Sequence, residues 1–416
     1  MAAENLRCKE CKTEYPLDAR YVCERCFGPL EVTYSHPQDR DVAEWRRRIQ
    51  GGPQNIWRYA DFLPLQAHPG SSTRASSRAG LPAGCTPLIR ADRLAEKLGL
   101  GEVWIKNDAA NPTHSFKDRV VSVAVARARE LGYETLACAS TGNLANSVAA
   151  HAAALGMESY VFIPADLEEQ KILATGVYGT HLVAVNGNYD DVNRLCTEIS
   201  GEHEWAFVNV NMRPYYAEGS KTLAFEVAEQ LGWELPDRCI APIASGSLFT
   251  KINRGFEEWL ELGLISGDVP VMNGAQADGC SPVATAFANG TDVCKPVKPD
   301  TIAKSLAIGN PADGPYAVEL ARRTGGGVDS VSDDEIKAGI RLLAETTGIF
   351  TETAGGVTTA VLAKLAERGD IGKDERVVVF ITGEGLKTLD AVRDTFETIT
   401  IEPKYEAFEA ATGVTA

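Results

Sequence analysis

Short apolar runs alternate with helical stretches along the chain from about residue 85 onward. The run EVWIKND (102–108) has the length of a strand, whereas SFKDRVVSVAVARARELG (115–132) has the length of a helix that stops at a glycine. This alternation indicates βαβ units and a mainly parallel sheet, so we predict an α/β fold. We interpret NLANSVAAHAAALG (143–156) as a second helix, and as further strands TLACAS (135–140), SYVFIPA (159–165), HLVAVNG (181–187), AFVNVN (206–211), CIAPIASG (239–246) and RVVVFITG (376–383).

Four loops that follow predicted strands are rich in polar residues and glycine. In open parallel sheets, ligands bind at the carboxyl ends of the strands, where such loops lie. Each loop alone is ordinary turn chemistry, and neither a GxGxxG nor a Walker motif is present. Together they offer a lysine amine, an amide, hydroxyls and helix N-termini, which is the set that pyridoxal 5′-phosphate requires. The loops are NPTHSFKDR (111–119), ACASTGNLANS (137–147), APIASGSLFTK (241–251) and VVFITGEGLK (378–387).

Two CxxC pairs, CKEC (8–11) and CERC (23–26), lie close together near the start of the chain. Two such turns can surround one Zn²⁺ with four thiolates, which leaves no open coordination position for catalysis. The following stretch GPLEVTYS (28–35) has the alternation of a ribbon strand. Four free thiols or a redox pair are the alternatives. We predict one structural zinc ion held by Cys8, Cys11, Cys23 and Cys26.

Charge and composition restrict the possible partners and the compartment. The net charge of −16 and the pI of about 5.0 argue against a nucleic-acid or anionic-membrane partner, which would need a basic surface. The first residues contain no apolar signal region, and no apolar run approaches the roughly 18 residues of a membrane helix. The other six cysteines are scattered, which is typical of reduced thiols. We therefore expect a cytoplasmic protein.

The order of these motifs resembles that of the threonine synthase family, which belongs to the fold-type II pyridoxal-phosphate enzymes related to the tryptophan synthase β-subunit. The resemblance runs from about Cys85 to about Asp390, and one branch of the family carries a similar CxxC extension. It implies two open, mainly parallel α/β domains, a lyase activity and a homodimer. The motifs that carry it are NPTHSFKDR (111–119), ASTGNLANSVAAHAAALG (139–156), YAEGSKTLAFE (216–226), IAKSLAIGNP (302–311), FTETAGGVTTAVL (350–362) and TGEGLK (382–387).

The pattern and the resemblance together imply the following division of the chain. Residues 1–40 form a zinc-ribbon-like module and 41–84 a connector. Residues 85–400 form the pyridoxal-phosphate-dependent core, with a smaller subdomain at about 135–222 and the remainder in the larger domain. Residues 401–416 are a C-terminal tail.

The resemblance also implies roles for single residues around the cofactor. Lys117 matches the lysine that carries the cofactor covalently, and Asn143 matches the asparagine that bonds the ring oxygen. Thr382 matches the hydroxyl residue that faces the pyridine nitrogen. The family's phosphate-binding loop corresponds here to Ala244, Ser245, Gly246, Ser247 and Leu248, with hydroxyls in place of the usual amides.

The implied reaction makes L-threonine and phosphate from O-phospho-L-homoserine and water. The loop Ser140, Thr141 and Gly142 matches the segment that holds the substrate carboxylate. The candidates for contact with the substrate phosphate are Arg213, Lys221 and Lys304, although each could be an ordinary solvated base.

Two departures from the family leave the substrate open, because Ala307 and Tyr216 stand where family members often have arginine. The alternatives are a β-replacement enzyme that acts on O-phospho-L-serine, such as a cysteate synthase, and a threonine or serine dehydratase. A non-catalytic protein that uses the ribbon to bind a partner is a further alternative.

Overall fold

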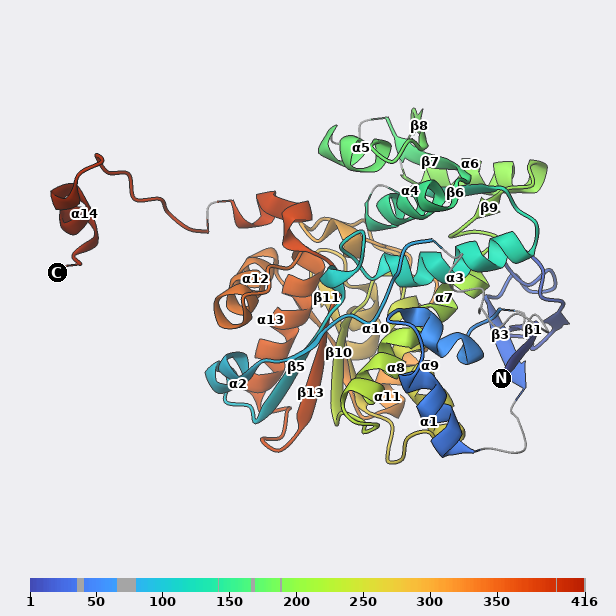
Figure 1. Cartoon of the computed structure of the whole chain (residues 1–416), viewed down its shortest axis with the longest axis horizontal. Helices are drawn as coiled ribbons and strands as arrows, with labels where there is room; N and C mark the ends of the chain where they lie inside the picture. Colours follow the sequence, from blue (N-terminus) through green and yellow to red (C-terminus); the bar gives the residue numbers. More distant parts are fainter. Residues whose placement is uncertain are drawn as a thin grey trace.

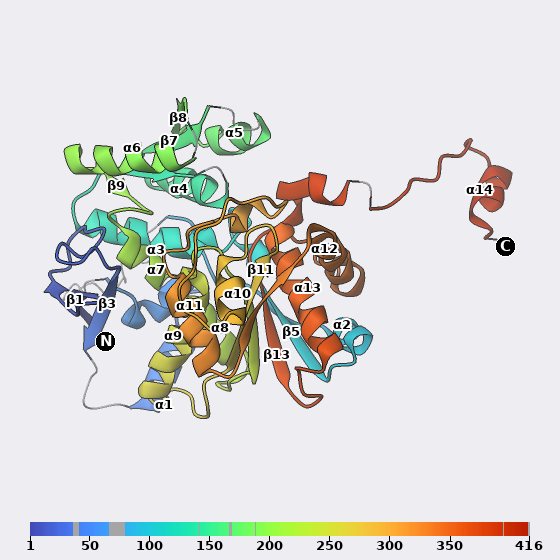
Figure 2. The same ribbon diagram turned by 180° about the vertical axis from the view of Figure 1, so that it is seen from behind.

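The strands in the described part of the chain form three separate sheets, which Figures 1 and 2 show from opposite sides. The computed structural model describes residues 1–35, 41–65, 80–140, 142–165, 169–187, 189–393 and 395–414. None of the helices within these ranges combines the length and the apolar character that crossing a bilayer requires. One fully parallel sheet and one mainly parallel sheet, together with many helices, confirm the predicted α/β class.

The largest sheet has six strands in the order β12-β11-β10-β13-β5-β4, and all neighbours are parallel except β4 and β5. Its central strand β13 is buried on both faces. Val377 and Val379 pack with α12 (Asp333–Thr347) and α13 (Thr353–Arg368). Val378 and Phe380 pack with α8 (Lys221–Gln230), α9 (Ser247–Glu261) and α11 (Gly314–Arg323). This alternation is the period-2 geometry of a strand covered by helices on both sides. The strands are β4 (Leu88–Arg90), β5 (Glu102–Asn107), β10 (Arg238–Pro242), β11 (Val271–Ala277), β12 (Gly327–Val331) and β13 (Arg376–Ile381).

Helices cover both faces of this sheet or pack beside the helices that cover them. They are α1 (Val42–Gln50), α2 (Asp92–Leu98), α3 (Lys117–Glu130), α7 (Arg213–Glu218), α8 (Lys221–Gln230), α9 (Ser247–Glu261), α10 (Pro282–Ala288), α11 (Gly314–Arg323), α12 (Asp333–Thr347) and α13 (Thr353–Arg368). Short 3₁₀ helices are η1 (Ile56–Phe62), η3 (Asp108–Ala110), η4 (Lys304–Leu306) and η5 (Gly385–Val392).

A smaller, fully parallel sheet has the order β8-β7-β6-β9 and lies beside α3 in both views. The predicted strand 206–211 is wrong beyond Phe207, where the chain turns. The side chain of Asn211 accepts from the Phe207 N–H at 2.9 Å and donates to the Trp205 carbonyl at 3.0 Å, which closes the turn. The elements are β6 (Thr135–Ala139), α4 (Asn143–Leu155), β7 (Glu158–Pro164), α5 (Glu169–Gly176), β8 (His181–Val185), α6 (Tyr189–Glu202) and β9 (Ala206–Phe207).

The N-terminal module is an antiparallel sheet of β1 (Ala2–Cys8), β2 (Glu14–Tyr15) and β3 (Leu30–Ser35). Leu6 and Val32 bury their side chains in one cluster with Val121 of α3 and Tyr215 of α7, so the module is fixed to the core. At the other end, the chain leaves the body and finishes with α14 (Tyr405–Thr412), which stands apart in Figure 1.

Candidate active site

Three of the four predicted site loops lie at the carboxyl ends of neighbouring strands. Strands β10, β13 and β5 lie side by side in the large sheet. The loop after β5 leads to Lys117, the residue after β13 is Thr382, and the loop after β10 leads into α9. The Phe116 N–H donates to the Thr382 carbonyl oxygen at 3.0 Å, so the lysine loop lies directly beside the end of β13.

Lys117 is the first residue of α3, and its side chain is half-buried. Its Nζ donates to the Tyr216 hydroxyl at 2.8 Å and lies 4.5 Å from the centre of the Phe116 ring. The loop before it is held by Asp118, whose carboxylate accepts from the Thr113 N–H at 2.6 Å and from the Thr113 hydroxyl at 2.7 Å. A carboxylate in the first helical turn also suits the helix dipole.

Asn143 is the first residue of α4 and is bonded at both ends of its amide. Nδ2 donates to the carboxylate of Glu352 at 3.0 and 3.2 Å, and Oδ1 accepts from the Lys387 Nζ at 2.8 Å. Lys387 also donates to the Thr113 carbonyl at 2.6 Å. These contacts bring α4, α13 and η5 together beside the loop that carries Lys117.

The loop before α4 is partly open. The Ser140 hydroxyl accepts from the N–H groups of Gly142 and Ala145 at 3.4 and 3.3 Å. A Cβ atom added at Gly142 would meet no heavy atom of the described residues within 4 Å, apart from those of its chain neighbours. Thr141 lies outside the described residues.

The segment 244–248 forms a tight turn into α9. Gly246 has φ +97°, and a Cβ atom there would lie 2.7 Å from the carbonyl oxygen of Asp313, so glycine is required. The first N–H groups of a helix have no partner within it, so those of Ser247 and Leu248 can bind an anion. This turn therefore fits a phosphate group.

The three basic candidates have different surroundings. Arg213 begins α7, one turn before Tyr216, and its Nη2 lies 2.7 Å from the Asp313 carboxylate. Lys304 is exposed in η4. Lys221 is fully buried, and its Nζ donates to both carboxylate oxygens of Glu258 at 2.9 Å. The expectation that Lys221 contacts a substrate is therefore wrong, because its amine is committed to a buried ion pair.

A buried ion cluster lies two residues beyond Lys117. Arg119 bonds the carboxylates of Asp108 and Glu226 at 2.6 Å each, and the Lys106 Nζ lies 2.7 Å from Glu226. All four side chains are at most 1 % exposed. The cluster anchors the start of α3 to β5 and α8.

Four residues of this region were not among the residues expected for the site. They are Asp118, Tyr216, Glu352 and Lys387. Each lies inside a motif that the sequence had singled out, so the motifs were a signal. Their contacts join segments distant in the chain, and no local spacing reveals such contacts.

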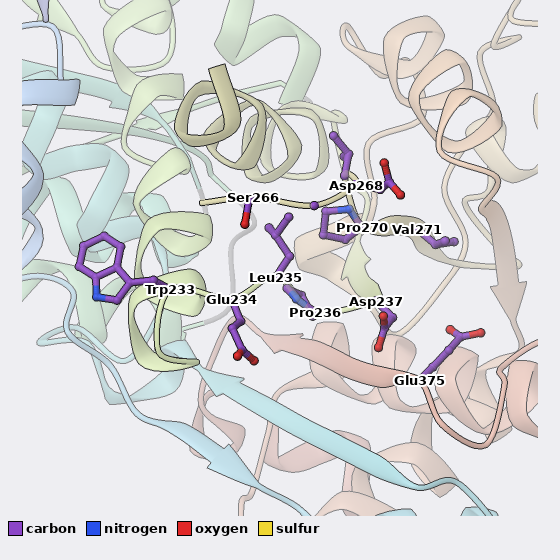
Figure 3. A pocket seen from close by; sticks show the side chains of 12 residues that line it. Trp233, Glu234, Leu235, Pro236, Asp237, Ser266, Asp268, Pro270, Val271 and Glu375 are labelled. Atoms are coloured by element: carbon purple, nitrogen blue, oxygen red, sulfur yellow. The ribbon is translucent and has the colours of Figure 1, made fainter. Parts of the chain in front are cut away.

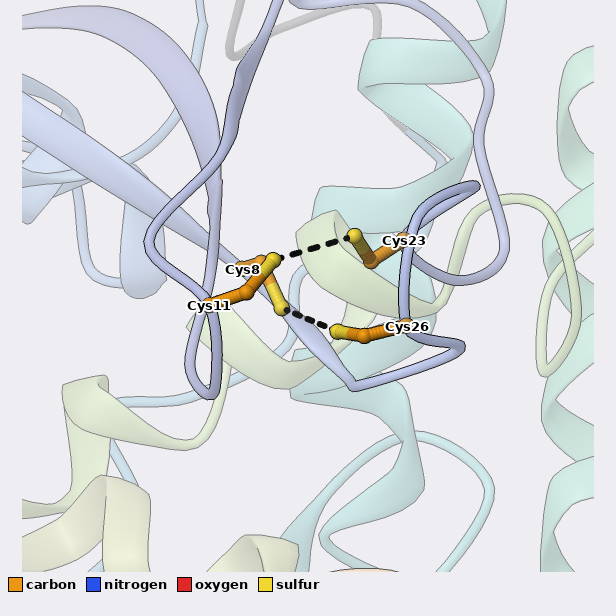
Figure 4. Close-up of side chains that lie close together, drawn as sticks. All are labelled: Cys8, Cys11, Cys23 and Cys26. Atoms are coloured by element: carbon orange, nitrogen blue, oxygen red, sulfur yellow. Dashed lines mark hydrogen bonds between the residues drawn. The ribbon is translucent and has the colours of Figure 1, made fainter.

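The four N-terminal cysteines converge, and Figure 4 shows their sulfur atoms directed toward one another. All four Sγ atoms lie within 4.8 Å of each other. The two turns have the same backbone geometry. The N–H of Lys12 donates to the Cys8 carbonyl, and the N–H of Phe27 donates to the Cys23 carbonyl. The φ angles of Lys12 and Phe27 are 61° and 60°. Four thiols arranged in this way fit a tetrahedral zinc ion.

A cleft of the described part of the chain lies elsewhere in the molecule. It has a volume of about 530 Å³ and is lined by residues 233–237, 266–271 and Glu375 (Figure 3). These residues precede or begin β10, β11 and β13, so the cleft lies at the amino ends of the strands. Ligands of open parallel sheets bind at the opposite ends, and we do not assign the site to this cleft.

The residues at the carboxyl ends fit pyridoxal 5′-phosphate. An amine, an oriented amide, a buried hydroxyl residue and a glycine turn at a helix start are all present. Lys117 would bind the aldehyde, Asn143 the ring oxygen, Thr382 the ring nitrogen and 244–248 the phosphate.

Comparisons with known proteins agree with this chemistry. Residues 80–383 match the family described as "Pyridoxal-phosphate dependent enzyme". The chain is 38% identical over 400 residues to a threonine synthase of Methanocaldococcus jannaschii, covering 95% of this chain and 96% of the relative. It is 36% identical to a threonine synthase of Methanosarcina acetivorans, with 95% of each chain covered.

Solved structures share the fold. A threonine deaminase of Solanum lycopersicum superposes with a TM-score of 0.61 at 18% identity, covering 92% of this chain and 93% of that chain. An L-serine ammonia-lyase from Rhizomucor miehei gives a TM-score of 0.61 at 22% identity, covering 74% and 96%. The chain belongs to the threonine synthase family of pyridoxal-phosphate-dependent enzymes.

Proposed function

We propose that this protein is a lyase that converts O-phospho-L-homoserine and water to L-threonine and phosphate. The observation that carries the proposal is the half-buried Lys117 amine at the head of α3, 2.8 Å from Tyr216, in a chain similar over 95% of its length to threonine synthases. Bound pyridoxal 5′-phosphate supplies the electron sink that stabilises a carbanion beside the substrate's amino group.

The residues of this chain have separate roles in the proposal. Lys117 holds the cofactor and then moves protons between substrate carbons, while Tyr216 orients its amine. The N–H groups after Ser140 bind the substrate carboxylate. Arg213 and Lys304 are the remaining candidates for the substrate phosphate. Arg213 is already paired with Asp313, so contact with a phosphate would require it to share that partner.

A comparison of two substrates tests this proposal. Purified protein loaded with pyridoxal 5′-phosphate is given O-phospho-L-homoserine or O-phospho-L-serine, and free phosphate and the amino-acid product are measured. We expect phosphate and threonine from the first substrate at a rate far above that from the second. Faster phosphate release from O-phospho-L-serine would move the assignment to a β-replacement enzyme.

We also propose the domain division 1–40, 41–84, 85–400 and 401–416, with the smaller subdomain at about 135–222. The three separate sheets support it, since the four-stranded sheet uses strands between Thr135 and Phe207. The ten cysteines, all within the described ranges and none in a disulfide, suit the reducing cytoplasm, which we propose as the compartment.

We further propose a homodimer in which the C-terminal arm, residues 395–416, packs on a second copy of the chain. The arm leaves the body and exposes apolar side chains that a single copy does not cover, among them Phe396, Ile399, Tyr405 and Phe408. Removal of residues 395–416 should convert a dimer to a monomer in sedimentation equilibrium. Dimers of unchanged stability in the truncated chain would refute this role of the arm.

A further inference from the structure

Asp313 is in direct contact with the loop 244–248. Its N–H donates to the Ser245 carbonyl oxygen at 2.8 Å. Gly246 lies so close that an added Cβ would approach the Asp313 carbonyl carbon at 2.8 Å. Both contacts are made by backbone atoms, so the loop and Asp313 cannot shift independently of each other.

The Asp313 carboxylate is buried and faces two cations from different parts of the chain. Oδ2 lies 2.7 Å from the Arg213 Nη2, and Oδ1 lies 3.8 Å from the Lys9 Nζ. An unbalanced carboxylate beside an anion-binding turn would repel a phosphate. The two cations therefore prepare the turn for its ligand.

Lys9 belongs to the first cysteine turn, between Cys8 and Cys11. Its amine lies 3.6 Å from the centre of the Tyr316 ring, and its side chain is 20% exposed. The Tyr316 hydroxyl donates to the carboxylate of Glu10, the next residue of the same turn. The first CxxC turn thus rests on the start of α11, where both Asp313 and Tyr316 lie.

We propose that Asp313 is a positioning residue through which the four-cysteine module sets the affinity of the loop 244–248 for the cofactor phosphate. A metal held by the cysteines fixes the Cys8–Cys11 turn, and this turn holds Lys9 against Asp313. Loss of the metal or of the Lys9 charge leaves Asp313 with Arg213 alone and lowers the affinity for phosphate. The inference rests on the proposed role of the loop in binding the cofactor.

Cofactor affinity in a double-mutant cycle tests this coupling, because it isolates the interaction of two residues. The dissociation constant of pyridoxal 5′-phosphate is measured by titration of the cofactor-free protein, together with zinc content and the thermal transition. Lys9→Met should weaken cofactor binding about tenfold, because the loss of a partly buried ion pair costs more than that of an exposed pair and less than that of a fully buried pair. In the Asp313→Asn background, Lys9→Met should have almost no effect on the dissociation constant. In the otherwise wild-type chain, Lys9→Arg keeps the positive charge and should retain most of the wild-type affinity.

The control is Arg25→Met, which removes an exposed cation between the two cysteines of the second CxxC turn and should leave binding unchanged. Equal affinity of Lys9→Met and Arg25→Met, or an equal effect of Lys9→Met in both backgrounds, would overturn the inference. Should Lys9→Met fold poorly or lose zinc, chelation of zinc replaces it: binding should weaken in the wild type and hardly change in Asp313→Asn. An equal response of both proteins to chelation counts against the coupling.

A separate variant tests the cofactor site itself. Ser245→Asp places a negative charge in the turn and should weaken binding strongly, whereas Ser266→Asp at the opposite end of the sheet should not. Unchanged binding in Ser245→Asp would refute the loop as the phosphate site. Weak binding in Ser245→Asp with normal binding in Lys9→Met would refute the coupling and leave the site intact.

Discussion

The amide nitrogen of Asn143 lies 3.0 Å from Oε2 of Glu352, a residue 209 positions further along the chain. Burial raises the pKa of the Glu352 carboxyl, while the bond from Asn143 and the charge of Lys387 oppose the rise. Lys387 bonds the other end of the same amide. Because one end of an amide donates and the other accepts, the two partners fix its orientation.

Removal of the Lys387 amine should leave the Asn143 amide without a fixed orientation. We expect Lys387→Met to lower kcat about tenfold to a hundredfold and to shift the absorbance maximum of the bound cofactor, because Asn143 loses its fixed orientation. Lys373→Met, on an exposed lysine, is the control. An unchanged spectrum and kcat in Lys387→Met would show that Glu352 alone orients the amide.

Lys117→Ala should fold and lose turnover by several orders of magnitude, since covalent attachment and proton transfer depend on one amine. Borohydride treatment followed by mass spectrometry should find the cofactor on Lys117 in the wild type and on no lysine in the variant. Lys97→Ala, on an exposed lysine of α2, should behave as the wild type. An adduct on another lysine would contradict the assignment; Lys106 is a poor substitute, because its buried amine bonds Glu226 and the Thr86 carbonyl.

Tyr216→Phe removes the hydroxyl that accepts from Lys117. We expect kcat to fall about tenfold or more while the cofactor stays bound, because the amine loses its orienting partner. The neighbouring Tyr215→Phe is the matched control. It removes a bond to the Asp18 carbonyl and should cost about 1 kcal/mol of stability without changing kcat. The same kcat in both variants would contradict the role given to Tyr216.

Metal analysis of the purified protein should find about one zinc ion per chain. Cys23→Ser should lose this zinc and lower the thermal transition, because the three-stranded module has a small core of its own. Cys294→Ser, at a cysteine outside the cluster, should keep the zinc ion and the wild-type thermal transition. A zinc-free wild-type protein with full activity and unchanged stability would rule out the metal site.

The ion cluster around Arg119 predicts a loss of stability in acid. Burial alone would raise the pKa of Glu226, but Arg119 and Lys106 outweigh burial and lower the pKa to about 2, from an ordinary value of 4.5. A carboxyl with a lower pKa in the folded state stabilises the fold fully above pH 4.5. This stabilisation is lost as the pH falls from 4.5 toward 2.

Glu226→Gln should lower the free energy of unfolding near pH 7 by about 3 kcal/mol, because it leaves two buried cations poorly paired. It should also flatten the decline of stability below pH 4.5. Urea unfolding at several pH values measures both effects, with the exposed Glu96→Gln as the control. If the free energy of unfolding of Glu226→Gln falls in acid as steeply as that of the wild type, other carboxylates cause the fall.

Elements of the catalytic core could be predicted where a strand is buried on both faces or a helix ends at a glycine. The run 376–383 contains β13, and 143–156 contains α4. Strand β1 escaped prediction because AAENLRC lacks a regular alternation and is stabilised by pairing with β3. Lys221 was expected at the substrate phosphate because a buried lysine and a ligand-binding lysine look the same in sequence. Its partner Glu258 lies 37 residues away, so the ion pair has no local signal.

The cluster of Lys106, Asp108, Arg119 and Glu226 contains two positive and two negative groups that water cannot reach. A single neutral replacement leaves an opposite charge buried, so an intermediate with one change is less stable than either end point. Evolution can therefore alter these positions most easily in compensating pairs. Across homologous sequences the four positions should covary, and a chimaera that takes α3 from one relative and α8 from another should fold best when both carry the same set of charges.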